Sequence, residues 1–128
     1  MKIYGIVAEY NPFHNGHKFQ IDEIRKKAGD CAIVSVMSGN YVQRAETAVM
    51  SKYARAKAAL LGGVDLVLEL PMPYAISSAE RFAYSSVHIL NSLGAVTDIS
   101  FGSECGSISI LKKAVEALYD ENVNLKLK

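Results

Sequence analysis

His14 and His17 lie three residues apart in the stretch AEYNPFHNGHKF, which runs from Ala8 to Phe19. An apolar run ends just before this stretch and a helical pattern begins within it. Residues three apart in a helix share a side, so both rings are expected to face one ligand. Two imidazole N–H donors beside the positive end of a helix would suit a phosphate. They would stabilise charge building on a nucleotide attacked at its α-phosphorus.

The residues around the histidines fit a strand that turns into a helix. Asn11 precedes Pro12, which favours extended backbone and therefore a turn after the strand. Gly16 has no Cβ, so the backbone there could approach a ligand closely. The segment thus predicts an anion site at a helix N-terminus.

Two other interpretations of the histidine pair stay open. His14 could be an ordinary loop residue and His17 a half-buried helix residue, because short motifs often occur by chance. A zinc ion could also be shared by two histidines at this spacing. Glu9 with Cys31 or Cys105 could complete such a site, although no usual ligand spacing supports it.

Strand and helix patterns alternate along the whole chain. Strands are predicted at 3–9, 31–37, 64–70 and 96–101, and helices at 15–30, 51–61, 77–94 and 107–122. This order indicates an α/β fold with a parallel sheet and right-handed crossovers. The tail 123–128 alternates apolar and polar residues and could begin another strand.

Two helices carry patterns that predict how they start and pack. Ser77 and Glu80 have capping-box spacing at the start of the third helix. Apolar stripes at helical spacing predict which faces are buried. On the third helix the stripe is Phe82, Ala83, Val87, Leu90 and Leu93, and on the fourth it is Leu111, Ala114, Val115 and Leu118.

Polar and glycine-rich clusters follow three of the predicted strands, at 11–17, 38–44 and 102–106. In open α/β sheets, ligands bind at the carboxyl ends of the strands. These clusters are therefore expected to gather at one edge of the sheet, around the histidine pair.

Composition indicates one globular domain without a general affinity for nucleic acid. The 128 residues carry a net charge of +1, so any RNA contact would need a local basic patch. No signal peptide is recognisable, and no apolar run approaches the roughly 20 residues of a membrane span. The two cysteines match no metal or redox spacing. A cytoplasmic protein with no membrane contact is expected.

Five strings in order make the sequence familiar: GIVAEYNPFHNGHKFQI, MSGNYVQR, GVDLVLELP, SAERFA and FGSECG. Together they resemble the tRNA(Met) cytidine acetate ligase family, part of the HxGH nucleotidyltransferase superfamily. The resemblance covers essentially the whole chain. It implies a three-layer Rossmann-like nucleotidyltransferase domain with a parallel sheet over residues 1–128.

The resemblance also implies an activity. Family members use ATP, with Mg²⁺, to activate acetate as acetyl-adenylate. They then transfer the acetyl group to the wobble cytidine of elongator tRNA(Met). His14 and His17 would be the catalytic residues, with Asn11, Asn15, Gly16 and Lys18 shaping or neutralising the phosphate pocket. Gly102 would let adenine or ribose lie against the backbone. The implied ATP-binding residues are Val7, Ala8, Glu9, Tyr10, Asn11, Pro12, Phe13, His14, Asn15, Gly16, His17, Lys18, Phe19, Gln20 and Gly102.

Other charged residues are weaker candidates. The family usually reads VQRGEPA where this chain reads VQRAETA, so the loop around Arg44 could differ in shape. Arg44 could meet phosphate or RNA, or be a surface residue. Lys52 and Arg55 are expected to be surface charges. Glu69 is either a carboxylate near the site or a turn residue, and His88 is expected to be structural.

Members of this family are much longer than 128 residues. A second phosphate-binding signature and a helical tRNA-binding region would lie beyond Lys128, so the chain is expected to be an N-terminal portion. Weak nucleotide binding and no acetyl transfer are expected of it alone. A small-molecule nucleotidyltransferase and a non-catalytic nucleotide-binding or RNA-scaffolding module remain the alternatives.

Overall fold

A four-stranded parallel sheet forms the centre of the computed structural model, which describes residues 1–119. The strand order is β3-β2-β1-β4. The strands are β1 (Lys2–Ala8), β2 (Cys31–Ser38), β3 (Leu66–Leu70) and β4 (Asp98–Ser100). The predicted α/β fold with a parallel sheet is confirmed. The strand suggested for 123–128 lies outside the described residues.

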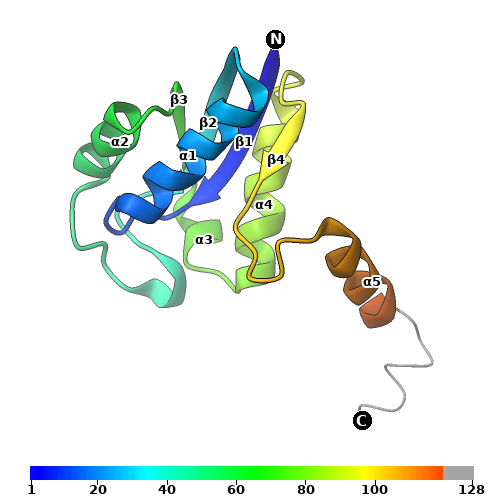
Figure 1. The fold of residues 1–128 in the computed structure, drawn as a ribbon. Coiled ribbons are helices and arrows are strands. Elements are labelled where there is room, and N and C mark those ends of the chain that lie inside the picture. Colours follow the sequence, from blue (N-terminus) through cyan, green and yellow to red (C-terminus); the bar gives the residue numbers. More distant parts are fainter. Residues whose placement is uncertain (120–128) are drawn as a thin grey trace.

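Helices cover both faces of the sheet and give three layers (Figure 1). On one face Ile21 and Ile24 of α1 (Asn15–Ala28) and Ala59 of α2 (Lys52–Leu61) join a core with Ile6 and Ile33 of the sheet. The opposite core is built with residues of α3 (Met72–Ala75) and α4 (Ala79–Ser92).

Strand β2 explains why the sheet is buried on both faces. Its residues alternate between the two cores, with Ile33 and Met37 in one and Val34 and Val36 in the other. A continuous apolar run is typical of a parallel strand covered by helices on both sides.

The strand order places a topological switch point between β1 and β4. From β1 the chain moves outward through β2 to β3, and then returns to pair β4 with the other side of β1. Crevices at the carboxyl ends of such neighbouring strands are where open α/β sheets bind ligands. Helix α1 follows β1 directly, so its N-terminus lies at this edge.

The start of α4 differs from the prediction. Ser78 is the N-cap, and its Oγ accepts from the Arg81 N–H at 3.4 Å. Ser77 instead donates its hydroxyl to the Tyr74 carbonyl at 2.6 Å. The predicted capping box at Ser77 is wrong because the short helix α3, absent from the sequence prediction, occupies the preceding residues and uses Ser77 at its end.

Two of the five residues in the predicted stripe on α4 are buried. Phe82 and Leu90 are buried, and Ser86 completes their row while its hydroxyl donates to the Phe82 carbonyl at 2.8 Å. A serine can occupy this buried position because the helix backbone satisfies its hydroxyl. The helix therefore packs along the 82-86-90 row, which leaves the predicted stripe members Ala83, Val87 and Leu93 exposed.

Helix α5 (Ile108–Tyr119) projects away from the sheet (Figure 1). Its predicted buried stripe is wrong for the described residues, since Ala114 and Val115 are exposed and Leu111 is only half-buried. Within residues 1–119 this helix does not pack on either core.

Candidate functional site

The two histidines form a capping box at the start of α1. His14 is the N-cap residue, and its Nδ1 accepts from the Gly16 N–H at 3.1 Å. Three residues on, the Nδ1 of His17 accepts from the His14 N–H at 3.2 Å. The reciprocal pair is a capping box, built here from two imidazoles.

This box fixes which ring nitrogens can donate. Because both Nδ1 atoms accept hydrogen bonds, the proton of each neutral ring sits on Nε2. The rings stack with their centroids 3.8 Å apart and an angle of 28° between their planes. The expectation that His14 and His17 share one side of the helix is therefore confirmed, and two Nε2–H donors lie beside the start of α1.

The environment favours the neutral form of the His17 ring. Burial lowers the pKa of His17, and the neighbouring charge of protonated His14 lowers it further. A neutral ring keeps its Nδ1 lone pair for the capping box and its Nε2–H for a ligand. The pair can thus donate to an anion while it holds the helix end.

The buried Tyr10 ring packs against the His17 ring. Its side chain is 1% exposed, and its ring meets that of His17 edge-on, with centroids 4.9 Å apart. The Phe13 ring packs against both rings, and its centroid lies 5.3 Å from that of Tyr10 and 5.5 Å from that of His17. Tyr10 adopts a positive φ of 49°, which is uncommon for a residue with a side chain. Burial also raises the pKa of its phenol.

Gly16 is required by the cap itself. A Cβ at this position would lie 2.9 Å from Cε1 of the His14 ring. Real Cβ atoms rarely approach other atoms so closely, so a side chain here would displace the capping ring.

Several residues of the predicted ATP-binding segment hold neighbouring loops with their side chains. Glu9 Oε1 accepts from the Gln43 N–H and Asn11 Oδ1 accepts from the Val49 N–H, both at 2.8 Å. Gln20 donates through Nε2 to the carbonyl and hydroxyl oxygens of Ser100, each at 3.2 Å. These bonds tie the start of α1 to the loop 39–51 on one side and to the end of β4 on the other.

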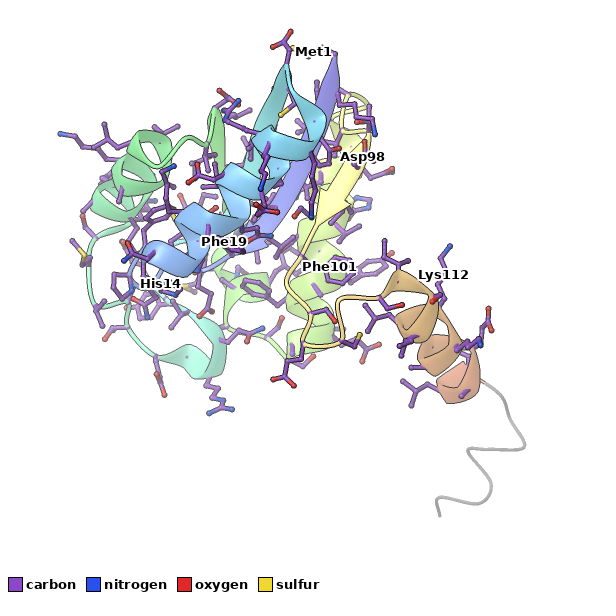
Figure 2. All side chains as sticks on the ribbon, viewed as in Figure 1. Met1, His14, Phe19, Asp98, Phe101 and Lys112 are labelled. Carbon is purple, nitrogen blue, oxygen red and sulfur yellow. The ribbon has the colours of Figure 1, made fainter. Side chains whose placement is uncertain are left out.

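A cavity of about 780 Å³ opens between α1, β4 and the segment that follows β4. It is lined in part by Gly16, Phe19, Gln20, Ser100, Phe101 and Gly102. Figure 2 shows His14 at the free end of α1, with Phe19 farther along that helix and Phe101 on the segment leaving β4. The structure thus brings Gly102 to the same cavity as Gly16, whereas His14 and His17 are not among the residues that line it.

Exposed surfaces in this cavity suit a flat ligand. Phe19 is 67% exposed and Phe101 is 61% exposed, so each offers an uncovered ring. A Cβ at Gly102 would have no atom within 4 Å, so the backbone there is open. Lys18 is also exposed at the first turn, where it forms an ion pair with Asp22.

The other polar candidates differ in their burial and in their partners. Arg55 is completely buried, so the expectation of a surface charge is wrong for it. Lys52 pairs with Glu69 at 2.6 Å, which gives that carboxylate a partner on α2. Arg44 is exposed in the short 3₁₀ turn Gln43–Ala45. His88 stacks on Tyr84 of the same helix, with centroids 6.4 Å apart.

The zinc hypothesis finds no set of ligands in the described part of the chain. Within residues 1–119, no three His, Cys, Asp or Glu side chains come close enough together to hold a metal ion. Cys31 is buried and Cys105 is exposed. The same residues include no helix that is long and apolar enough to cross a membrane.

Sequence reasoning missed the supporting roles of Tyr10 and Arg55. Tyr10 lies within the predicted segment, but nothing in its type shows that it would pack under His17. Arg55 lies between Ala54 and Ala56, but the exposed Lys57 also lies between two alanines, so the neighbouring residues gave no sign that Arg55 is buried.

Comparisons with known proteins place this geometry in a family. The model of the HIGH nucleotidyl transferase family matches residues 1–128. A tRNA(Met) cytidine acetate ligase from Clostridium kluyveri is 51% identical over 127 residues, and one from Caldicellulosiruptor saccharolyticus is 53% identical over 123. These alignments cover 99% and 95% of this chain, but only 31% and 30% of the relatives.

A solved structure agrees with the sequence relatives. Thermotoga maritima TmcAL bound to α-thio ATP superposes with a TM-score of 0.87 at 46% identity, covering 94% of this chain and 29% of that one. The chain therefore spans about 30% of the length of the proteins it matches, and the resemblance seen in the sequence is confirmed. Because the family model matches residues 1–128 and the relatives agree with it, the chain belongs to the HIGH nucleotidyl transferase family.

Proposed function

We propose that this chain binds ATP at the N-terminus of α1 and serves an ATP-dependent ligase that acetylates the wobble cytidine of elongator tRNA(Met). Acetate would attack the α-phosphorus of ATP and pyrophosphate would leave, which gives acetyl-adenylate. The cytidine amine would then attack the activated carbonyl and release AMP. Residues 1–128 would form the nucleotidyltransferase domain of this protein, which would act in the cytoplasm and bind tRNA.

The histidine pair carries the proposal. The Nδ1 atoms of His14 and His17 accept the hydrogen bonds of the capping box, so each ring has its Nε2–H free to donate at the positive end of α1. Hydrogen bonds from these donors to phosphate oxygens would strengthen as negative charge builds in the transition state. The reaction then depends mainly on positioning and charge stabilisation, as in other phosphoryl transfers.

The cavity provides room for the rest of the nucleotide. Adenine or ribose would lie against the open backbone at Gly102, with the exposed rings of Phe19 and Phe101 nearby. Lys18 could neutralise phosphate by leaving its partner Asp22. Mg²⁺ would be carried chiefly by the phosphates of ATP, as is common for this ion.

The relatives support this choice of acceptor. They are named for tRNA(Met), cytidine and acetate, and a solved relative holds α-thio ATP. Because they are about three times longer than this chain, we expect nucleotide binding but no acetyl transfer from it alone.

The decisive experiment separates phosphate binding from helix capping. Asparagine is a good N-cap, so His14→Asn keeps the cap while it removes the Nε2–H donor. A hydrogen bond to a charged group contributes about 1.5–3 kcal/mol, so ATP affinity should fall about 10- to 100-fold by calorimetry. The urea midpoint should stay nearly unchanged.

His88→Asn is the matched control, because it removes the histidine that lies on α4 away from the site. Equal ATP affinity in His14→Asn and His88→Asn would refute the proposed site. A crystal soaked with α-thio ATP gives a second check, since its phosphates should lie against His14 and His17.

The acceptor is tested by ATP–pyrophosphate exchange, with this chain and with a full-length relative. Exchange stimulated by acetate supports the ligase. Stimulation only by a phosphorylated metabolite would favour a small-molecule nucleotidyltransferase. Nucleotide binding without exchange in either protein would favour a binding module.

A further inference from the structure

Arg55 on α2 is a fully buried cation whose hydrogen bonds join three separate segments. Its exposed fraction is 0%. The guanidinium donates through Nη1 to the Glu9 carbonyl at 2.5 Å, through Nε to the Met50 carbonyl at 3.2 Å, and through Nη2 to the Gly39 carbonyl. A buried charge is costly unless its donors are satisfied, and here each nitrogen of the guanidinium has a carbonyl partner.

The three carbonyls belong to segments that adjoin the turn leading to His14. Glu9 follows β1 and opens the turn that leads to His14. Gly39 follows β2, and Met50 precedes α2. Arg55 therefore fixes the backbone at the carboxyl ends of two adjacent strands and the far end of the loop 39–51.

Two further bonds join the same segments. The Glu9 carboxylate accepts from Gln43, and the Asn11 amide oxygen accepts from Val49. The turn before α1 and the loop 39–51 are thus held as one unit, with the guanidinium of Arg55 at its buried centre. Burial lowers the pKa of Arg55 while the carboxylates of Glu9 and Glu69 raise it, and an arginine remains charged in this situation.

We propose that Arg55 is a positioning residue for the reaction: it sets the turn between β1 and α1 so that His14 and His17 face the phosphates. This inference rests on the proposed function. A lysine keeps the charge but carries its donors on one nitrogen, so it cannot reach all three carbonyls, which meet Nε, Nη1 and Nη2 of Arg55 at separate places. Arg55→Lys should therefore loosen the turn without removing any group that touches ATP.

Arg25 offers a matched control at the opposite edge of the sheet. Its Nη1 donates to the Cys31 carbonyl at 3.1 Å, and its Nη2 donates to the Gly63 carbonyl at 2.7 Å and to Asp65 at 3.0 Å. These partners lie at the amino ends of β2 and β3. Arg25→Lys breaks the same kind of fork, but at a distance from the histidines.

The experiment measures ATP affinity by calorimetry and the ¹⁵N signals of the histidine rings by NMR, with each variant fully folded. Arg55→Lys should weaken ATP binding at least about tenfold, because the histidine donors lose their alignment. It should also raise the share of the Nδ1–H tautomer in His14 and His17, since the capping box loosens. Arg25→Lys should lower the urea midpoint but leave ATP affinity and the ring signals unchanged.

Gln43→Pro gives a second test if Arg55→Lys does not fold. This substitution removes the backbone N–H that donates to the Glu9 carboxylate. Gln43 is the first residue of a 3₁₀ turn, a position where proline fits. ATP binding should weaken severalfold with the same change in the ring signals.

The outcomes distinguish the two proposals. If wild type does not bind ATP, or if His14→Asn binds it as tightly as wild type, the proposed function fails. If those results hold but Arg55→Lys leaves affinity and ring signals at wild-type values, only the role of Arg55 is refuted. Where Arg55→Lys does not fold, wild-type values in Gln43→Pro would refute the premise that joining the turn to the loop 39–51 aligns the histidines, and the role of Arg55 would fall with it. Equal losses in Arg55→Lys and Arg25→Lys would likewise overturn it.

Discussion

Gly62→Ala should weaken the proposed phosphate site by pushing on the Phe13 ring. Gly62 ends α2 with φ −74° and ψ −8°, a conformation that alanine adopts freely. A Cβ there would lie 2.4 Å from Cζ and 2.8 Å from Cε1 of the Phe13 ring. The substitution is therefore a purely steric perturbation, aimed at the residue that precedes His14.

The size of the effect follows from the contact distances. Carbon atoms pack best at about 3.5–4.0 Å, so the ring must move by at least about 1.1 Å. Overpacking of this kind costs about 1–3 kcal/mol. The smaller entropy of an unfolded chain with alanine offsets about 0.4–1 kcal/mol of that. Because Phe13 also packs on His17, ATP affinity should fall about tenfold.

A double-mutant cycle tests whether Phe13 transmits the effect. Gly62→Ala, Phe13→Ala and the double variant are compared by urea unfolding and by ATP calorimetry. The clash cannot occur without the ring, so Gly62→Ala should cost almost nothing in the Phe13→Ala background. If the two substitutions add to within about 0.5 kcal/mol, the reasoning from this contact is refuted.

Three other outcomes are expected. Since the pKa of His17 lies below its ordinary value in the folded chain, the unfolded chain binds more protons, and stability should fall as pH drops below about 6.5. His17→Gln should flatten that dependence in urea titrations at pH 5 and 7, and an unchanged slope would contradict it. Leu90→Ala empties a fully buried position and should cost about 2–5 kcal/mol while ATP affinity stays constant; a cost below 1 kcal/mol would argue against tight packing there. Ala45 has a φ of 58°, so Ala45→Gly should raise the melting temperature slightly, and a decrease would show that the residue is not strained.

The fold was largely predictable because its signals are local and repeated. Continuous apolar runs predicted the strands, and alternation with helical patterns predicted the parallel sheet. The α4 stripe was predicted less well, since Ser86 is buried and Val87 is not. A hydroxyl that bonds to its own helix can replace an apolar side chain, and periodicity alone does not show this.

The placement of the histidine pair was predictable, but the way the two rings are held was not. The spacing of His14 and His17 indicated a shared side of α1, and the structure confirms it. The reciprocal capping could not be read from the sequence, because imidazoles are unusual in that motif. The burial of Arg55 was missed because its partners are backbone carbonyls, which any sequence supplies.

The imidazole capping box resolves a conflict between two demands on one helix end. The usual box has a glutamate at its third helical position, and that carboxylate would repel an incoming triphosphate. His17 occupies this position and accepts the same backbone N–H without bringing a negative charge. If this helix end binds a polyphosphate as proposed, a glutamate there would keep the helix capped but repel the ligand, whereas the imidazole caps the helix without opposing it.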